Sequence, residues 1–60
     1  MYQKIFNHMC SLRAQWTEKG LPIDDDAMYA ETTARDLDID LEEHEDIIWG
    51  AAQEVASGCF

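Results

Sequence analysis

The chain has 60 residues, with thirteen acidic and four basic side chains and a formal net charge of −9. This length allows one small hydrophobic core and argues against a deep enzymatic cleft, so we expect a single helical domain over residues 1–60. At 47% hydrophobic residues the chain is too apolar for a disordered acidic tail. A field of this sign repels nucleic acid and anionic membranes, and it attracts basic proteins.

The first predicted element is a helix over about residues 2–19. Gly20 suits the left-handed residue that follows a helix end, and Leu21 stands where a Schellman motif places an apolar contact back to Trp16. Pro22 prevents the helix from continuing. The apolar residues that recur at helical spacing on one face are Tyr2, Ile5, Phe6, Met9, Leu12 and Trp16.

A second helix is expected over about residues 24–38. Asp24 is a good N-cap, and Asp25 and Asp26 fall in the first turn, where the helix dipole favours anions. Ile23 and Met28 have the spacing of a hydrophobic staple. Small residues dominate the predicted inward stripe and allow close helix packing: Ala27, Ala30, Ala34 and Leu37.

A third helix is expected over about residues 41–57. Asp40 and Glu43 form a variant of the capping box, Gly58 is a natural stop, and His44 falls at the edge of the core. The inward face contains Leu41, Ile48, Ala51, Ala52 and Val55. Three helices joined by short connections predict an all-α fold, a compact three-helix bundle.

The two cysteines, Cys10 and Cys59, are too few for a disulfide framework, so we expect free buried thiols. The N-terminal region lacks the apolar run of a signal peptide, and no stretch approaches the ~18 apolar residues of a membrane span. These features predict a soluble protein of the cytoplasm, with no membrane partner.

The spacing of Asp36, Asp38 and Asp40 resembles the first three ligand positions of a calcium-binding loop. Such a loop needs glycine at its sixth position and a bidentate glutamate at its twelfth, and here those positions are Leu41 and Ile47. We therefore expect no specific metal site. No catalytic or cofactor-binding motif is present either, which predicts a protein without enzymatic activity.

Residues 34–39 resemble the Ala-x-x-Leu-Gly-Ile turn of helix-turn-helix domains, with Asp38 in place of glycine. His44 stands where that family has an apolar residue. The resemblance implies a recognition helix that starts near Asp40, but that helix would present four acids to the phosphates of DNA. Because DNA binding depends on Lys and Arg, direct binding to nucleic acid is not expected.

The charge is unevenly distributed along the chain. Residues 1–20 contain three basic residues and one acid, whereas residues 24–46 contain eleven acids against Arg35 alone. Trp49 and Tyr29 fall outside the predicted apolar stripes, beside acids, and suit an interface with a basic protein. Alternatively, each aromatic ring closes a thin core. The predicted partner-binding residues are Asp24, Asp25, Asp26, Tyr29, Glu31, Asp36, Asp38, Asp40, Glu42, Glu43, Glu45, Asp46 and Trp49.

In size, acidity and helical content the chain resembles small phage-encoded inhibitors of bacterial defence, including anti-CRISPR proteins. The resemblance implies a DNA-mimicking inhibitor in the cytoplasm of a bacterial host, whose partner is a CRISPR effector or another basic nucleic-acid-binding complex. The alternative is a small dimerising adaptor or an antitoxin-like regulatory module, in which apolar faces drive assembly and the acids give solubility. Both a monomer and a homodimer remain open.

Overall fold

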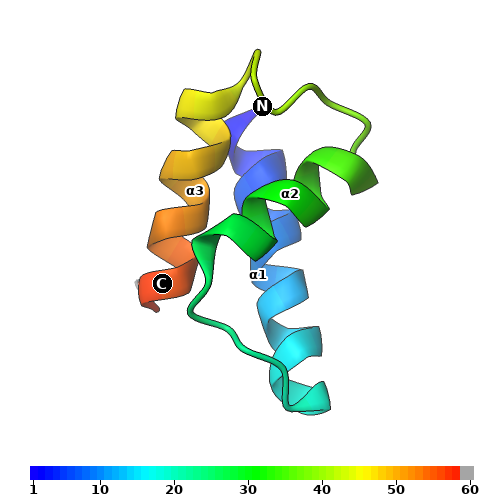
Figure 1. Cartoon of the computed structure of the whole chain (residues 1–60), viewed down its shortest axis with the longest axis vertical. Coiled ribbons are helices and arrows are strands. Elements are labelled where there is room, and N and C mark those ends of the chain that lie inside the picture. Colours follow the sequence, from blue (N-terminus) through cyan, green and yellow to red (C-terminus); the bar gives the residue numbers. More distant parts are fainter. Residues whose placement is uncertain (59–60) are drawn as a thin grey trace.

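The computed structural model describes residues 1–58 and contains three helices: α1 (Tyr2–Lys19), α2 (Asp26–Asp36) and α3 (Glu45–Ser57). The predicted all-α, three-helix fold is confirmed. In Figure 1, α1 and α3 run in the same direction, and α2 crosses in front of them. α3 packs extensively against both other helices, whereas α1 and α2 meet over fewer residues.

The core is small and built mainly from side chains at helical spacing. α3 contributes its predicted inward residues from Ile48 onward, and α1 contributes every fourth or third residue from Ile5 to Trp16. Thr33 is the buried polar residue of this part of the chain. The buried hydrophobic residues are Ile5, Met9, Leu12, Trp16, Tyr29, Ala30, Ala34, Ile48, Ala51, Ala52 and Val55.

α1 ends as the sequence predicts. Gly20 adopts the left-handed conformation (φ 75°), its N–H donates to the carbonyl of Thr17, and the N–H of Leu21 donates to the carbonyl of Trp16 over 2.8 Å. This pair of hydrogen bonds defines a Schellman motif. The side chain of Leu21 is nevertheless 44% exposed.

The start of α2 differs from the prediction by two residues. Asp25, not Asp24, is the N-cap: its Oδ1 accepts a hydrogen bond from the N–H of Ala27 over 3.1 Å. Asp24 is exposed and precedes the cap. Three consecutive aspartates offer three possible caps, and the backbone of Asp25 has the extended conformation that the position requires.

The start of α3 also differs. Residues 41–44 form a turn, and the helix begins at Glu45 with His44 as its N-cap, so the predicted capping box of Asp40 and Glu43 does not start the helix. Instead, Oδ1 of Asp40 accepts from the N–H of Glu42 over 3.0 Å and holds the turn. Asp40 thus stabilises the turn before α3 and lies about one turn too early in the chain to cap the helix.

Two contacts tie α1 to α3. The hydroxyl of Tyr2 donates to the Oε2 of Glu54 over 2.5 Å. The guanidinium of Arg13 donates to the carbonyl of Val55 in the last turn of α3, where the helix dipole favours a cation. α3 then ends at Gly58, which is left-handed (φ 79°) as the sequence predicts.

Candidate acidic interface

Residues 38–46, called the acidic segment below, connect α2 to α3 and include the first two residues of α3. Six of these nine residues are acidic, and all six are exposed: Asp38, Asp40, Glu42, Glu43, Glu45 and Asp46. The segment lies at the same end of the molecule as the N-terminus of the chain (Figure 1). It is the part of the predicted partner-binding surface that the fold brings together.

The acidic segment begins with a sharp turn. The N–H of Ile39 donates to the carbonyl of Ala34 over 3.0 Å, and the N–H of Asp38 donates to that of Arg35 over 3.3 Å, which is a second Schellman motif. Asp38 has a φ of 54°, the left-handed conformation that glycine usually occupies. Asp38 therefore adopts the conformation expected of the glycine that it replaces in the helix-turn-helix resemblance.

The remainder of that resemblance is not observed. The carbonyl of Asp40 accepts from the N–H of His44 over 3.1 Å within the turn, and α3 starts at Glu45, five residues after the predicted start of a recognition helix. The connection is therefore longer than the 3–4-residue turn typical of such domains.

Apolar residues alternate with the acids and hold the segment against the core. Ile39, Leu41 and Ile47 are half-buried and pack against the core cluster, and His44 is also half-buried, at the core edge as predicted. Their neighbours on either side consequently point outward. The half-buried residues of the segment therefore hold it against the core, and the acids between them remain exposed to solvent.

The six carboxylates of the acidic segment form no ion pair within residues 1–58. Glu45 and Asp46 stand in the first turn of α3, where the helix dipole stabilises them. The other four acids receive no such help from a helix terminus. Asp40 accepts a hydrogen bond from the N–H of Glu42, and the charges of Asp38, Glu42 and Glu43 are screened by solvent and ions.

The structure does not bring all the acids of the predicted interface together in one place. Asp24, Asp25 and Asp26 lie at the N-terminal end of α2, whereas the acidic segment follows its C-terminal end. The eleven residues of α2 separate the two groups by about 16 Å along the helix axis. Between them, exposed Glu31 stands one turn before exposed Arg35, so the outer face of α2 is not a row of carboxylates.

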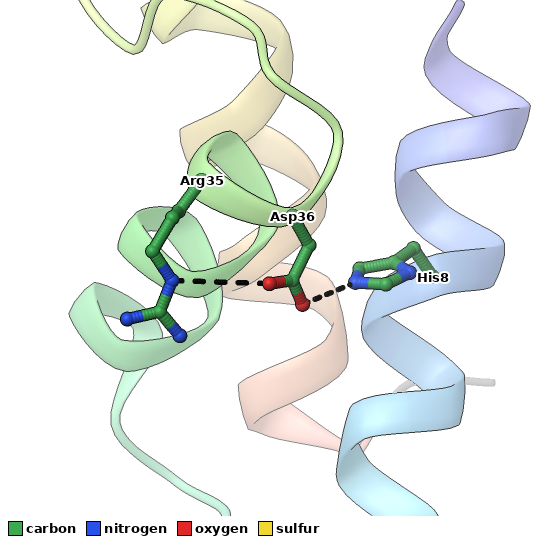
Figure 2. A network of polar contacts seen from close by, with 3 residues as sticks. All are labelled: His8, Arg35 and Asp36. Carbon is green, nitrogen blue, oxygen red and sulfur yellow. Dashed lines mark hydrogen bonds and ion pairs between the residues drawn. The ribbon is translucent and has the colours of Figure 1, made fainter.

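Asp36 is also distinct from the acidic segment because it faces another part of the protein. Its Oδ2 lies 3.0 Å from Nε2 of His8 on α1, and its Oδ1 lies 3.8 Å from Nε of Arg35 (Figure 2). This contact links the last residue of α2 to the middle of α1. Asp36 therefore has a structural role that the sequence pattern did not reveal.

Tyr29 is not available to a partner. Its side chain is 0% exposed, its ring lies 4.7 Å from that of Trp16 between centroids, and its hydroxyl donates to the carbonyl of Ile23 over 2.7 Å. The alternative in which this ring closes the core is correct. Trp49 is intermediate: it packs against the core and remains partly exposed beside the acidic segment.

Both tyrosines hold their protons more tightly than usual. The hydrogen bond to Glu54 is the main cause that raises the pKa of Tyr2 above its ordinary value of 10.0, followed by burial. For Tyr29 the main cause is burial, and the nearby Asp24 raises its pKa further while Arg13 lowers it. Each hydroxyl donates to another group of the protein, Tyr2 to Glu54 and Tyr29 to the carbonyl of Ile23.

A shallow groove on α1, with a volume of about 350 Å³, was not expected from the sequence. Four residues of α1 line it: Cys10, Arg13, Ala14 and Thr17. Cys10 is a half-buried free thiol, and Cys59, for which a free thiol was also predicted, lies outside the described residues. Within residues 1–58, no group of three or more His, Cys, Asp or Glu side chains is arranged to hold a metal ion.

Across the described helices, none has both the length and the apolar character needed to cross a membrane. Comparisons with protein-family models, with curated proteins and with solved structures gave no match to this chain.

Proposed function

We propose that this chain is a non-enzymatic binding protein that inhibits a basic nucleic-acid-binding protein by occupying its DNA site. One observation carries the proposal. Six exposed carboxylates lie within nine residues, and none forms an ion pair in the described part of the chain. The contact surface is the acidic segment together with the exposed part of Trp49.

Charge density favours a partner that normally binds phosphates. Duplex DNA carries one negative charge per ~1.7 Å of axis, and proteins that bind it neutralise these charges with Lys and Arg. No other stretch of nine residues in the chain contains as many as six acids. Such carboxylates can pair with the same basic side chains, and long-range attraction accelerates the encounter.

Maintaining this density has a stability cost. Like charges held close together repel one another, and a domain of 60 residues has little stability to spare. Helix-start preferences account only for Glu45 and Asp46. Asp40 also holds the turn before α3, so a role in binding gives a reason for Asp38, Glu42 and Glu43.

The resemblance to anti-CRISPR proteins suggests a CRISPR effector, or another DNA-handling complex, as the partner. The bound carboxylates would exclude the nucleic acid from its basic channel. Trp49 adds apolar contact at the edge of the acidic segment, in the manner of aromatic hot spots at other interfaces.

The test captures partners from a bacterial lysate on the immobilised chain and then elutes them with duplex DNA. We expect bound proteins to be released by DNA and by added salt, because both compete for basic side chains. The double variant Glu42→Lys/Glu43→Lys should lose these proteins while its far-ultraviolet circular dichroism stays helical.

The matched control is Asp24→Lys/Glu31→Lys, which changes the net charge by the same amount at exposed positions outside the acidic segment. This control should retain most of the binding. Partners that resist both DNA and salt, or equal losses in the two double variants, would contradict the proposal.

A further inference from the structure

α1 has an outward face that no other helix covers. Its residues follow one another at intervals of three and four, the spacing of the seam in a two-helix coiled coil, and all are exposed. Small side chains occupy the middle of this face, and charged side chains occupy its two ends. The seam consists of Lys4, Asn7, Ser11, Ala14 and Glu18.

This face is self-complementary about Ser11. Lys4 lies seven residues before Ser11 and Glu18 lies seven residues after it. When two copies of α1 align antiparallel with their Ser11 residues opposite each other, Lys4 of each copy meets Glu18 of the other. A parallel alignment would instead bring like charges together, so the charges specify the antiparallel arrangement.

The exposed apolar residues fit the same register. Met1 and Leu21 are 61% and 44% exposed, they flank α1, and each lies ten residues from Ser11. In the antiparallel arrangement Met1 of one copy and Leu21 of the other therefore fall at the same level along the helix pair, at both ends of the interface.

The two charged residues are also poorly placed for their own helix. Lys4 lies in the first turn of α1 and Glu18 in the last, opposite to the preference of the helix dipole. Neither forms an ion pair with another residue in the described range 1–58. An antiparallel second helix reverses this, since each charge then lies beside the terminus that attracts it.

We propose that the outward face of α1 is the interface of a two-fold symmetric homodimer. The proposal does not depend on the function of the acidic segment. Because that segment lies at the N-terminal end of α1 (Figure 1), antiparallel pairing places the two acidic segments at opposite ends of the dimer. Each chain has a charge of −9, and this separation keeps the repulsion between the two acidic segments low.

A single helix pair with a polar seam buries little surface, so the dimer should be weak and in rapid exchange. Sedimentation equilibrium over a range of concentrations should show a rise from the monomer mass towards twice that mass. Lys4→Glu and Glu18→Lys should each weaken dimerisation by about tenfold, since each introduces two like-charge contacts. The combined Lys4→Glu/Glu18→Lys variant should restore it.

Two further variants complete the test. Ser11→Arg places a bulky cation on the two-fold axis and should abolish the dimer, whereas Glu31→Lys, an exposed charge reversal on α2, should leave it intact. Circular dichroism confirms folding in each case. A monomer at every concentration, a dimer unaffected by the single reversals, or failure of the combined variant to recover would overturn the proposal.

Discussion

The rings of Trp16 on α1 and Tyr29 on α2 lie 4.7 Å apart between centroids, with their planes inclined by 32°. This contact joins the two helices that share the fewest other residues. The hydroxyl of Tyr29 also donates to the carbonyl of Ile23, so one side chain fixes both the core and the connection before α2. Tyr29 therefore helps to fix the position of α2 through both contacts.

Replacing Tyr29 should separate these two roles. Tyr29→Phe keeps the ring and removes the hydrogen bond to Ile23, which should lower the free energy of unfolding by about 1 kcal/mol. Tyr29→Ala also removes the ring from the core and should cost about 3–5 kcal/mol, enough to unfold a domain of this size. Urea denaturation followed by circular dichroism measures both. Equal effects of the two variants would contradict a packing role for the ring.

Thr33, in contrast to Tyr29, is a position where a substitution should stabilise the protein. Its side chain is 0% exposed, and its Oγ1 has no hydrogen-bond partner within the described chain. Thr33→Val replaces the hydroxyl with a methyl group of similar size, so it should raise the free energy of unfolding by about 1 kcal/mol. Thr33→Ser keeps the hydroxyl and loses the methyl group, and it should destabilise the protein. A destabilised Thr33→Val variant would show that the hydroxyl is satisfied.

The left-handed backbone of Asp38 predicts a gain from glycine. Asp38→Gly removes the strain of a β-carbon at a φ of 54° and should stabilise the protein by up to about 1 kcal/mol. Asp38→Asn is the matched control because it removes the same charge and keeps the β-carbon. If charge repulsion dominates at this position, the two variants will have the same midpoint of thermal unfolding, contrary to our expectation.

The raised pKa of Tyr29, caused chiefly by burial, predicts a loss of stability in alkaline solution. Below pH 10, the ordinary pKa of tyrosine, Tyr29 is neutral in both the folded and the unfolded chain, so its full contribution to stability is present. Above it the unfolded chain ionises first, so the free energy of unfolding falls as pH rises towards the folded pKa. Urea denaturation at about pH 8 and about pH 11 should show this fall, and Tyr29→Phe should reduce it.

Tyr2 provides the comparison for that experiment. Its pKa is raised mainly by its hydrogen bond to Glu54, so Tyr2→Phe should remove a separate part of the alkaline loss. The double variant Tyr2→Phe/Tyr29→Phe should lose less stability over this pH range than either single variant. An undiminished loss in the double variant would assign the effect to other groups.

The fold was predictable from the sequence because the signals that end its helices are local. Gly20 and Gly58 end their helices through a left-handed conformation that other residues rarely adopt. The apolar spacing in α1 from Ile5 to Trp16 then identifies the buried face directly. Neither inference requires knowledge of the other helices.

The starts of α2 and α3 were less predictable because several acids compete for each cap. Asp24 and Asp25 are equivalent in sequence, and only the path of the chain after Pro22 selects Asp25. Asp40 has the right residue type for a cap, but it stabilises a turn that delays α3 to Glu45. When several aspartates could each cap a helix, local propensity does not determine which of them the packed chain uses.

The candidate interface could be predicted only in part, for a geometric reason. Acids that are neighbours in sequence, as in the acidic segment, remain neighbours in space. Asp26 and Asp38 are separated by a helix that directs them to opposite ends. Likewise, periodicity placed Tyr29 outside the stripe of alanines, but the crossing of α2 over α1 turns this ring into the core.

The alternation within the acidic segment has a consequence for how this protein could evolve. Ile39, Leu41 and Ile47 anchor the backbone, whereas the exposed side chains of Glu42 and Glu43 form no hydrogen bond or ion pair in the described part of the chain. Substitutions at the outward positions could therefore accumulate and retune the surface towards a changing target while the scaffold persists. Under the proposed function, such a division would let the surface follow changes in a partner without loss of the fold.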